Sequence, residues 1–291
     1  MNGLLILDKP SGMTSHDVVA RVRRMTAEQS VGHLGTLDPM ATGVLPLLLG
    51  KFTRLAQFFN SSEKAYTGTI RFGFATDTYD AEGQPVGEAR TVVLNLDQLR
   101  AIAAQFQGEI EQMPPAFSAK KIEGKPAYKL ARAGKTPELK PVRIHVETFT
   151  IERVEEDRAE FSMRISAGGY VRAIAHSMGE ALGCGAHLAA LRRTAAGPFL
   201  LDQAIPLKEA ECRAAGGLLE QRLVHPRTLL PEMPSTTADE QTVGRIRNGM
   251  QVNLPEYSGA AQVKIFARQR DLVAIGRRVA GTLFQPAVVL C

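Results

Sequence analysis

Residues 31–50 of this 291-residue chain read VGHLGTLDPMATGVLPLLLG. Glycine and proline punctuate the first part, which predicts a structured loop, and residues 44–49 are apolar enough to predict a buried segment. The loop presents one carboxylate, Asp38, between Leu37 and Pro39. A carboxylate held rigidly beside apolar groups can act as a nucleophile or a general base. Asp-Pro also starts many turns, so the local pattern alone favours an Asx turn or a helix cap.

The flanking segments predict a mixture of strands and helices. Residues 3–7 predict a buried strand, the alternation over residues 65–74 predicts another, and residues 142–151 and 159–167 predict a strand pair around an acidic turn. Helical spacing and caps predict helices over residues 15–27 with Ser15 as the N-cap, from the Asn95 cap to Phe106, and over residues 171–182 closed by Gly183.

The composition is that of a globular protein: 44% of the residues are hydrophobic and 22% are charged. These values exclude a disordered tail, a coiled coil and a collagen-like chain, and the length predicts about two domains. The three cysteines are an odd number and lie far apart, which argues against a disulfide scaffold and favours a reducing compartment. The sequence shows neither a signal peptide nor an apolar run long enough to span a membrane, and we expect a cytoplasmic protein.

The net charge of +5 is distributed unevenly. Residues 118–143 hold eight basic and two acidic residues, a net charge of +6, and residues 244–291 hold seven basic and two acidic residues, a net charge of +5. The rest of the chain is acidic overall. Two basic blocks indicate either two contact surfaces for the phosphates of a nucleic acid or two solvated faces.

The chain also carries signs of its domain organisation. Residues 108–141 form a long connection rich in glycine and proline, and connections of that length are usually functional or mobile. Prolines at 226, 231 and 234 mark the best domain boundary. Thr237 to Glu240 then match a capping box, and residues 250–291 contain short apolar strands sufficient for a small barrel.

Several common site motifs are absent from the sequence. The spacing between Gly43 and Lys51 does not fit a phosphate-binding loop, and no dinucleotide fingerprint or Gly-x-Ser-x-Gly elbow occurs. Cys184 and His187, with His176 nearby, lack the second pair that a zinc site needs. We therefore expect no metal and no nucleotide cofactor.

Two further residues have a functional and a structural interpretation. Arg172 lies where a strand gives way to a helix; it is either a surface residue or a buried cation that pairs with Asp38 and keeps that carboxylate ionised by lowering its pKa. Tyr66 lies in a strand and either packs in the core or stacks on a base.

Taken together, these segments resemble one family over nearly the whole chain. The sequence is similar to the TruB family of bacterial tRNA pseudouridine-55 synthases. The similarity rests on five ordered motifs: Lys9 to Ser15, Gly32 to Leu45 with Tyr66 twenty-eight residues after Asp38, Pro114 to Tyr128, Tyr170-Val171-Arg172, and Leu191-Arg192-Arg193.

The resemblance implies an α+β fold. The expected core is a mixed, largely antiparallel sheet of the pseudouridine synthase type over residues 1–230, with an RNA-binding thumb inserted at about residues 112–142. A small PUA-like β-barrel is expected over residues 231–291.

The resemblance also implies a reaction, in which uridine at position 55 in the T loop of tRNA becomes pseudouridine after the base is flipped out. Asp38 is then the nucleophile, and Tyr66 and Arg172 are its catalytic partners. The implied substrate-binding residues are Lys9, His33, Tyr170, Leu191, Lys120, Lys121 and Lys125. No cofactor is implied, the partner is the T-arm of tRNA, and a monomer is the default. The alternatives are a non-catalytic tRNA-binding or tRNA-folding protein, and a hydrolase that uses Asp38 on a glycosidic bond.

Overall fold

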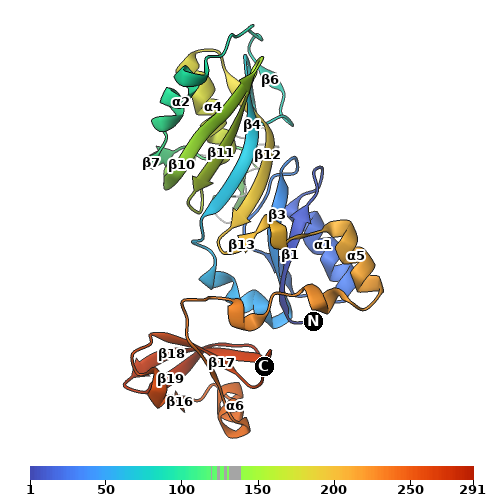
Figure 1. Ribbon diagram of the computed structural model, residues 1–291, viewed down its shortest axis with the longest axis vertical. Helices are drawn as coiled ribbons and strands as arrows, with labels where there is room; N and C mark the ends of the chain where they lie inside the picture. Colours follow the sequence, from blue (N-terminus) through green and yellow to red (C-terminus); the bar gives the residue numbers. More distant parts are fainter. Residues whose placement is uncertain (119, 123–124, 128–129, 131–138) are drawn as a thin grey trace.

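A computed structural model describes residues 1–118, 120–122, 125–127, 130 and 139–291, with the backbone alone at residues 121–122 and 125–126. The chain has an α+β fold built on a ten-stranded mixed sheet (Figure 1). The strands of this sheet are β1 (Gly3–Lys9), β2 (Val31–His33), β3 (Thr42–Leu49), β4 (Lys64–Phe72), β7 (Gly108–Gln112), β10 (Val142–Glu155), β11 (Arg158–Ile165), β12 (Ala186–Ala196), β13 (Phe199–Leu200) and β14 (Ile205–Pro206).

The order across the sheet is β14-β1-β3-β12-β4-β11-β10-β7, with β13 beside β12 and β2 beside β3. Strand β1 pairs with β14, and β12 pairs with β3, in parallel, whereas the remaining pairs are antiparallel. Two short ladders lie outside the sheet, β5 (Ala75–Thr76) with β6 (Pro85–Val86) and β8 (Lys121–Ile122) with β9 (Lys125–Pro126).

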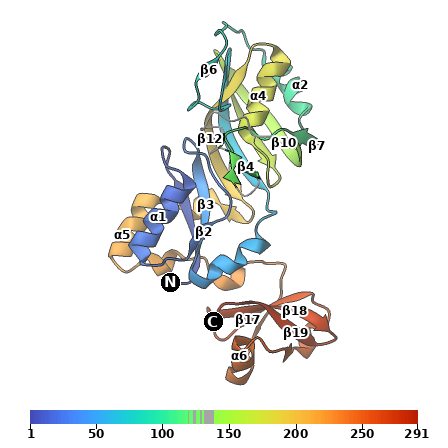
Figure 2. The ribbon, with the colours of Figure 1, turned by 180° about the vertical axis from the view of Figure 1, so that it is seen from behind.

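The helices of the described residues pack on this sheet, except the last of them, which packs on a smaller C-terminal sheet. They are α1 (Ser15–Thr26), α2 (Leu96–Ala104), α4 (Val171–Leu182), α5 (Leu207–Ala215) and α6 (Glu240–Arg247), with 3-10 turns η1 (Gly50–Phe58), η2 (Leu201–Gln203), η3 (Leu219–Arg222), η4 (Pro226–Thr228) and η5 (Pro255–Tyr257). Helices α2 and α4 cover the face of β10–β12 that is turned toward the viewer in Figure 2. The opposite face of these strands, seen in Figure 1, carries no helix of the described chain.

Strands β1 and β3 explain the two apolar runs of the sequence. Leu5 and Leu47 belong to the hydrophobic cluster that includes α1, whereas Leu4 and Leu48 belong to a second cluster, which packs on η1. Because successive side chains of a strand point to opposite faces, a strand buried on both faces must be apolar throughout. The prediction of a buried segment at residues 44–49 is confirmed.

Two helix caps differ from the predicted ones. Thr14, not Ser15, caps α1, because the Thr14 hydroxyl accepts from the backbone N–H of Asp17 at 3.0 Å. Asp239, not Thr237, caps α6 and accepts from Thr242. In both cases several neighbouring side chains could cap the helix, and the backbone conformation decides which one does. The predicted caps Asn95 and Gly183 are confirmed.

The C-terminal segment forms a separate five-stranded sheet with α6, at the end of the molecule away from α2 and α4 (Figure 1). Its strands, in the spatial order β15-β17-β18-β19-β16, are β15 (Ser235–Thr237), β17 (Gln262–Phe266), β18 (Leu272–Ala280), β19 (Leu283–Val289) and β16 (Val252–Asn253). Phe266 and Val288 pack in the same cluster as Leu48 and Phe52. The small sheet therefore shares a hydrophobic contact with the large one.

Candidate active site

The loop that carries Asp38 is fixed from below by α1. The Ser15 hydroxyl is buried and bonds both polar backbone groups of Leu37: it accepts from the N–H at 2.8 Å and donates to the carbonyl at 3.1 Å. Ser15 is therefore used to hold the residue next to Asp38, which is why it is unavailable as a helix cap.

Lys9 fixes the same loop from β1. Its ammonium group is fully buried and donates to the carbonyls of Met13 at 2.6 Å, Pro10 at 2.8 Å and Pro39 at 3.1 Å. Burial lowers the pKa of Lys9 to about 8, and the nearby carboxylates of Glu82 and Asp38 oppose that shift. Three bonds use all three donors of an ammonium group, so Lys9 joins the first motif to the Asp38 loop.

Arg193 holds both ends of the loop from β12. Only 1% of its side chain is exposed, and its guanidinium donates to the carbonyls of Val44 at 2.7 Å, Gly35 at 3.1 Å and Thr36 at 3.3 Å. Gly43, at φ +102°, allows the approach, because a Cβ there would lie 2.2 Å from the Arg193 carbonyl oxygen. Sequence reasoning did not single out Arg193 because its acceptors lie about 150 residues away.

Arg172 is the ion-pair partner of Asp38. Its side chain is 5% exposed, and its Nε lies 3.3 Å from Asp38 Oδ2, while the Asp38 side chain is one-third exposed. The alternative of a surface Arg172 is thus wrong. The expected lowering of the Asp38 pKa is wrong as well: burial raises the pKa of Asp38, and the attraction of Arg172 offsets only part of the effect.

A second carboxylate, Asp80, shares this arginine. Its Oδ2 lies 3.6 Å from Arg172 Nη1, its side chain is 4% exposed, and its negative charge also raises the pKa of Asp38. The Thr78 hydroxyl donates to Asp80 at 2.6 Å, and the Thr78 carbonyl accepts from Arg172 at 3.2 Å. Arg172 also donates to the Phe117 carbonyl at 2.7 Å. The Thr-Asp-Thr-Tyr-Asp run at residues 76–80 was the signal that sequence reasoning missed.

Three predicted pocket residues lie in the core or next to Arg172. Tyr66 and Leu191 are each 8% exposed and belong to the hydrophobic cluster that contains Leu37. Tyr170 precedes α4, and both its backbone groups are bonded by the buried amide of Gln112, at 2.8 and 2.9 Å. The Arg172 guanidinium carbon lies 6.0 Å from the centroid of the Tyr170 ring. Gln112 is a further residue that the sequence did not reveal.

His33 ends β2 and is partly buried. Burial and the nearby charge of Arg193 lower the pKa of its imidazole, which favours a neutral ring. Lys120, at the start of the predicted thumb, donates to the Lys140 carbonyl at 3.1 Å. The side chains of Lys121 and Lys125 lie outside the described residues.

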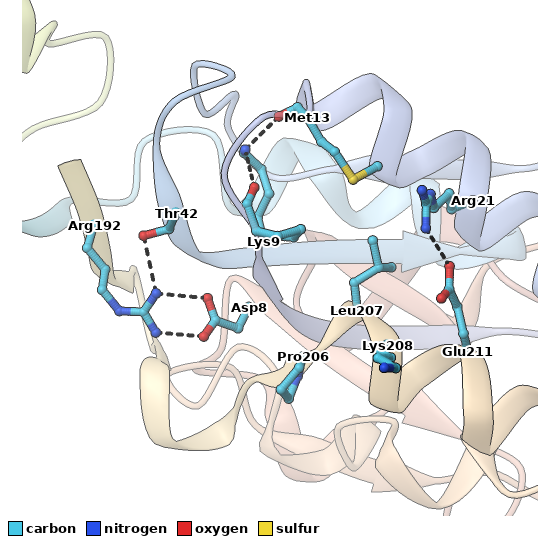
Figure 3. A pocket seen from close by; sticks show the side chains of 11 residues that line it. Asp8, Lys9, Met13, Arg21, Thr42, Arg192, Pro206, Leu207, Lys208 and Glu211 are labelled. Atoms are coloured by element: carbon cyan, nitrogen blue, oxygen red, sulfur yellow. Dashed lines mark hydrogen bonds and ion pairs between the residues drawn. The ribbon is translucent and has the colours of Figure 1, made fainter. Parts of the chain in front are cut away.

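Two cavities flank Arg192, which precedes the buried Arg193. One of about 460 Å³ lies between β1, α1 and α5, and there Arg192 forms a two-pronged ion pair with Asp8 and also donates to Thr42 (Figure 3). The other, of about 620 Å³, lies beside Met40 and Leu191. Arg192 of β12 thus lines both cavities, and Leu191 lines the second.

A metal-binding group and a membrane-spanning helix are both absent from the described parts of the chain. Among these residues, no group of three or more histidine, cysteine or acidic side chains is placed to hold a metal ion. His187 lies against the Phe74 carbonyl and ring. No helix found in the described ranges has the length and hydropathy to cross a membrane.

The fold matches chains of solved complexes that contain Cbf5. Over 96% of this chain and 79% of the other, it resembles a chain of a Cbf5-Nop10-Gar1 complex with a TM-score of 0.70 and 26% identity. A chain of an archaeal box H/ACA sRNP Nop10-Cbf5 complex matches over 100% and 86% of the two chains, with a TM-score of 0.69 and 25% identity. The model for the TruB family pseudouridylate synthase N-terminal domain matches residues 23–171. The chain is thus a pseudouridine synthase.

The family follows from the remaining comparisons. The model for the tRNA pseudouridylate synthase B C-terminal domain matches residues 172–225. The tRNA pseudouridine synthase B of Solibacter usitatus is 48% identical over the full length of both chains, and that of Aquifex aeolicus is 40% identical over 97% of this chain and 98% of its own. The chain belongs to the TruB family of tRNA pseudouridine synthases, and it isomerises uridine in tRNA.

Proposed function

We propose that the substrate is uridine 55 in the T loop of tRNA and that Asp38 is the nucleophile. The observation that carries this proposal is that the Asp38 carboxylate is partly exposed and is held in place by several contacts. Asp38 keeps one-third of its side chain exposed while Ser15, Arg193 and Arg172 hold its loop and its charge in place. A preorganised group of this kind has the rigidity that covalent catalysis needs.

The reaction breaks the bond between uracil N1 and the ribose C1′ and forms a bond between uracil C5 and C1′. A proton leaves C5 and N1 gains one, so the isomerisation balances without an added reagent. Asp38 attacks either C1′ or the uracil C6, or it assists a glycal route; the three routes remain alternatives. In each of them Arg172 orients Asp38 and offsets part of the cost of its ionisation.

The uracil must leave the base stack to reach Asp38, and flipping a base costs a few kcal/mol, in order of magnitude. Tyr66 packs on the flipped uracil, and Leu191 forms an apolar wall that excludes water while the base is detached. His33, as a neutral ring, fills the vacated place in the stack. Tyr170 adds a second aromatic side chain beside Arg172.

We further propose that three parts of the chain grip the T-arm. Residues 1–230 form the catalytic domain, residues of about 112–142 form its thumb, and residues 231–291 form a PUA-like RNA-binding module. The net charges of +6 and +5 in the two basic blocks support contacts with phosphates. Lys120, Lys121 and Lys125 are the proposed thumb contacts. We infer a cytoplasmic monomer.

The proposal is tested with a tRNA transcript labelled in its uridines. Asp38→Asn and Asp38→Ala are expected to abolish pseudouridine formation at the T loop while tRNA binding stays near that of the wild type, because many phosphate contacts hold the substrate. Asp97→Asn, which changes an exposed carboxylate at the start of α2, is the control. Wild-type turnover by Asp38→Ala would refute the assignment. Free uracil would indicate a glycosidase, and binding without product by the wild type would indicate a tRNA-folding protein.

A further inference from the structure

Tyr79 has an unusual backbone conformation. Its φ of +66° lies in the left-handed region, which residues with side chains rarely adopt. Three other described non-glycine residues share this sign of φ, of which Ala27 ends α1 and Glu156 turns β10 into β11. Tyr79 differs from these because it lies directly between the two residues that hold Arg172. Strained residues of this kind cluster at active sites, where the surrounding structure maintains them.

The positive φ brings two groups onto one guanidinium. Because the chain reverses at Tyr79, the Thr78 carbonyl and the Asp80 carboxylate both reach Arg172 Nη1, at 3.2 and 3.6 Å. The turn is also tied to the first part of β12: the Tyr79 carbonyl accepts from Leu188 at 2.9 Å, and Ala81 donates to the Leu188 carbonyl at 3.0 Å. The position of Arg172 thus depends on the shape of this turn.

The ring of Tyr79 makes a second contact with the same helix. It stacks on the imidazole of His176 with the ring centroids 3.9 Å apart and the planes 12° apart. His176 lies four residues after Arg172 in α4, so both side chains project from the same face of the helix. The turn therefore contacts α4 at two points, through polar groups at Arg172 and through stacked rings at His176.

We propose that Tyr79 and His176 are positioning residues whose stacked rings set the geometry of the Arg172–Asp38 ion pair. They act through Arg172 and do not contact the reacting atoms. When the stack is lost, the turn at residues 78–80 relaxes, and Arg172 no longer approaches Asp38 in the same way. This inference rests on the proposed role of Asp38.

The test compares kcat and KM for tRNA in variants that remove or keep the stacked rings. Tyr79→Leu and His176→Leu remove the stack, whereas Tyr79→Phe and His176→Phe keep two flat rings. We expect each Leu variant to lose at least tenfold in kcat with KM within threefold, and each Phe variant to stay within threefold of the wild type. The double Leu variant is expected to lose no more than either single variant, because both remove one contact.

The pH profile provides a readout that a purely structural contact would not change. Asp38 is surrounded by Arg172, Asp80, Lys9 and, farther out, Glu82, and Arg172 is the cation in direct contact. Weaker attraction from Arg172 raises the pKa of Asp38, so the acidic limb of kcat moves to higher pH in the Leu variants. Phe74→Leu removes a different ring contact, that of Phe74 with His187, and controls for general loss of stability.

The outcomes separate the inference from the proposed function. Leu variants with kcat within twofold of the wild type, or with a raised KM and unchanged kcat, overturn the positioning role. Losses in kcat equal to that of Phe74→Leu at equal thermal stability overturn it too. Asp38→Asn is measured in parallel: full activity in that variant refutes the nucleophile itself, whereas inactivity in it together with unaffected Leu variants refutes the positioning role alone.

Discussion

Replacing Arg193 by methionine removes the cation that holds both ends of the Asp38 loop. Three hydrogen bonds are lost, to Val44, Gly35 and Thr36, and 1% of the arginine side chain is exposed, so water does not replace them. A buried hydrogen bond contributes about 1 kcal/mol net, and more when the donor is charged. We expect the free energy of unfolding to fall by about 3 kcal/mol, a large share of the ~5–15 kcal/mol typical of a folded protein.

Urea unfolding monitored by circular dichroism measures this loss. The midpoint temperature of thermal unfolding is expected to fall by about 6–12 °C. Arg192→Met is the matched control: it removes the neighbouring arginine, whose ion pair with Asp8 is partly exposed, and is expected to cost about 1 kcal/mol or less. Because Arg193 lowers the pKa of His33, the imidazole pKa measured by NMR is expected to rise in Arg193→Met, while burial keeps it below its usual value. Equal losses in the two methionine variants, or an unchanged His33, would refute this account of the loop.

Three further predictions concern Lys9, Gly43 and the lysines of the proposed thumb. Burial lowers the pKa of Lys9 from 10.5 to about 8, so between these values the unfolded chain binds the proton more tightly and stability from this group rises with pH. Urea unfolding should show a steeper rise in the wild type than in Lys9→Met, because Lys64 and Lys264, whose pKa values burial also lowers, remain in both proteins. Gly43→Ala is expected to cost more than about 2 kcal/mol in unfolding free energy and most of the turnover, because its Cβ meets the Arg193 carbonyl, whereas Gly12→Ala, with a similar φ and open space, should cost less than Gly43→Ala in both measurements. Changing Lys120, Lys121 and Lys125 to glutamine should raise the Kd for tRNA and flatten its dependence on salt, and an unchanged slope would exclude phosphate contacts there.

The parts of the fold that depend on local pattern could be predicted from the sequence. Strands β1 and β3 are apolar over residues 4–7 and 44–49 because both of their faces are buried there, and α2 begins where a short-range signal places it, at the Asn95 cap. The glycine-rich stretch that holds Asp38 was also visible, since glycine and proline restrict the chain wherever they occur. These features need no knowledge of distant residues.

The supporting contacts of the site depend on residues far apart in the sequence. Thr14 and Ser15 are adjacent hydroxyl residues with the same capping ability, and Leu37, twenty-two residues away, decides that Ser15 holds the loop instead. Asp80 lies ninety-two residues before Arg172, and the polar run at residues 76–80 does not show which of its two aspartates is buried. Such roles follow from the register of the sheet, which places β12 between β3 and β4.

The same distance explains why the electrostatics of Asp38 were predicted with the wrong sign. In an isolated pair, Arg172 would lower the pKa of Asp38. In the folded chain the same guanidinium interacts with two carboxylates, Asp38 and the more deeply buried Asp80. Asp38 therefore receives only part of the attraction of Arg172, and burial dominates its pKa. When ionised, a carboxylate with a raised pKa is a better base and a better nucleophile than one whose charge is fully compensated by a cation. Keeping such a carboxylate in the fold lowers the stability of the folded protein. If Asp38 has its proposed role, the arrangement exchanges stability for reactivity at a carboxylate that remains partly exposed.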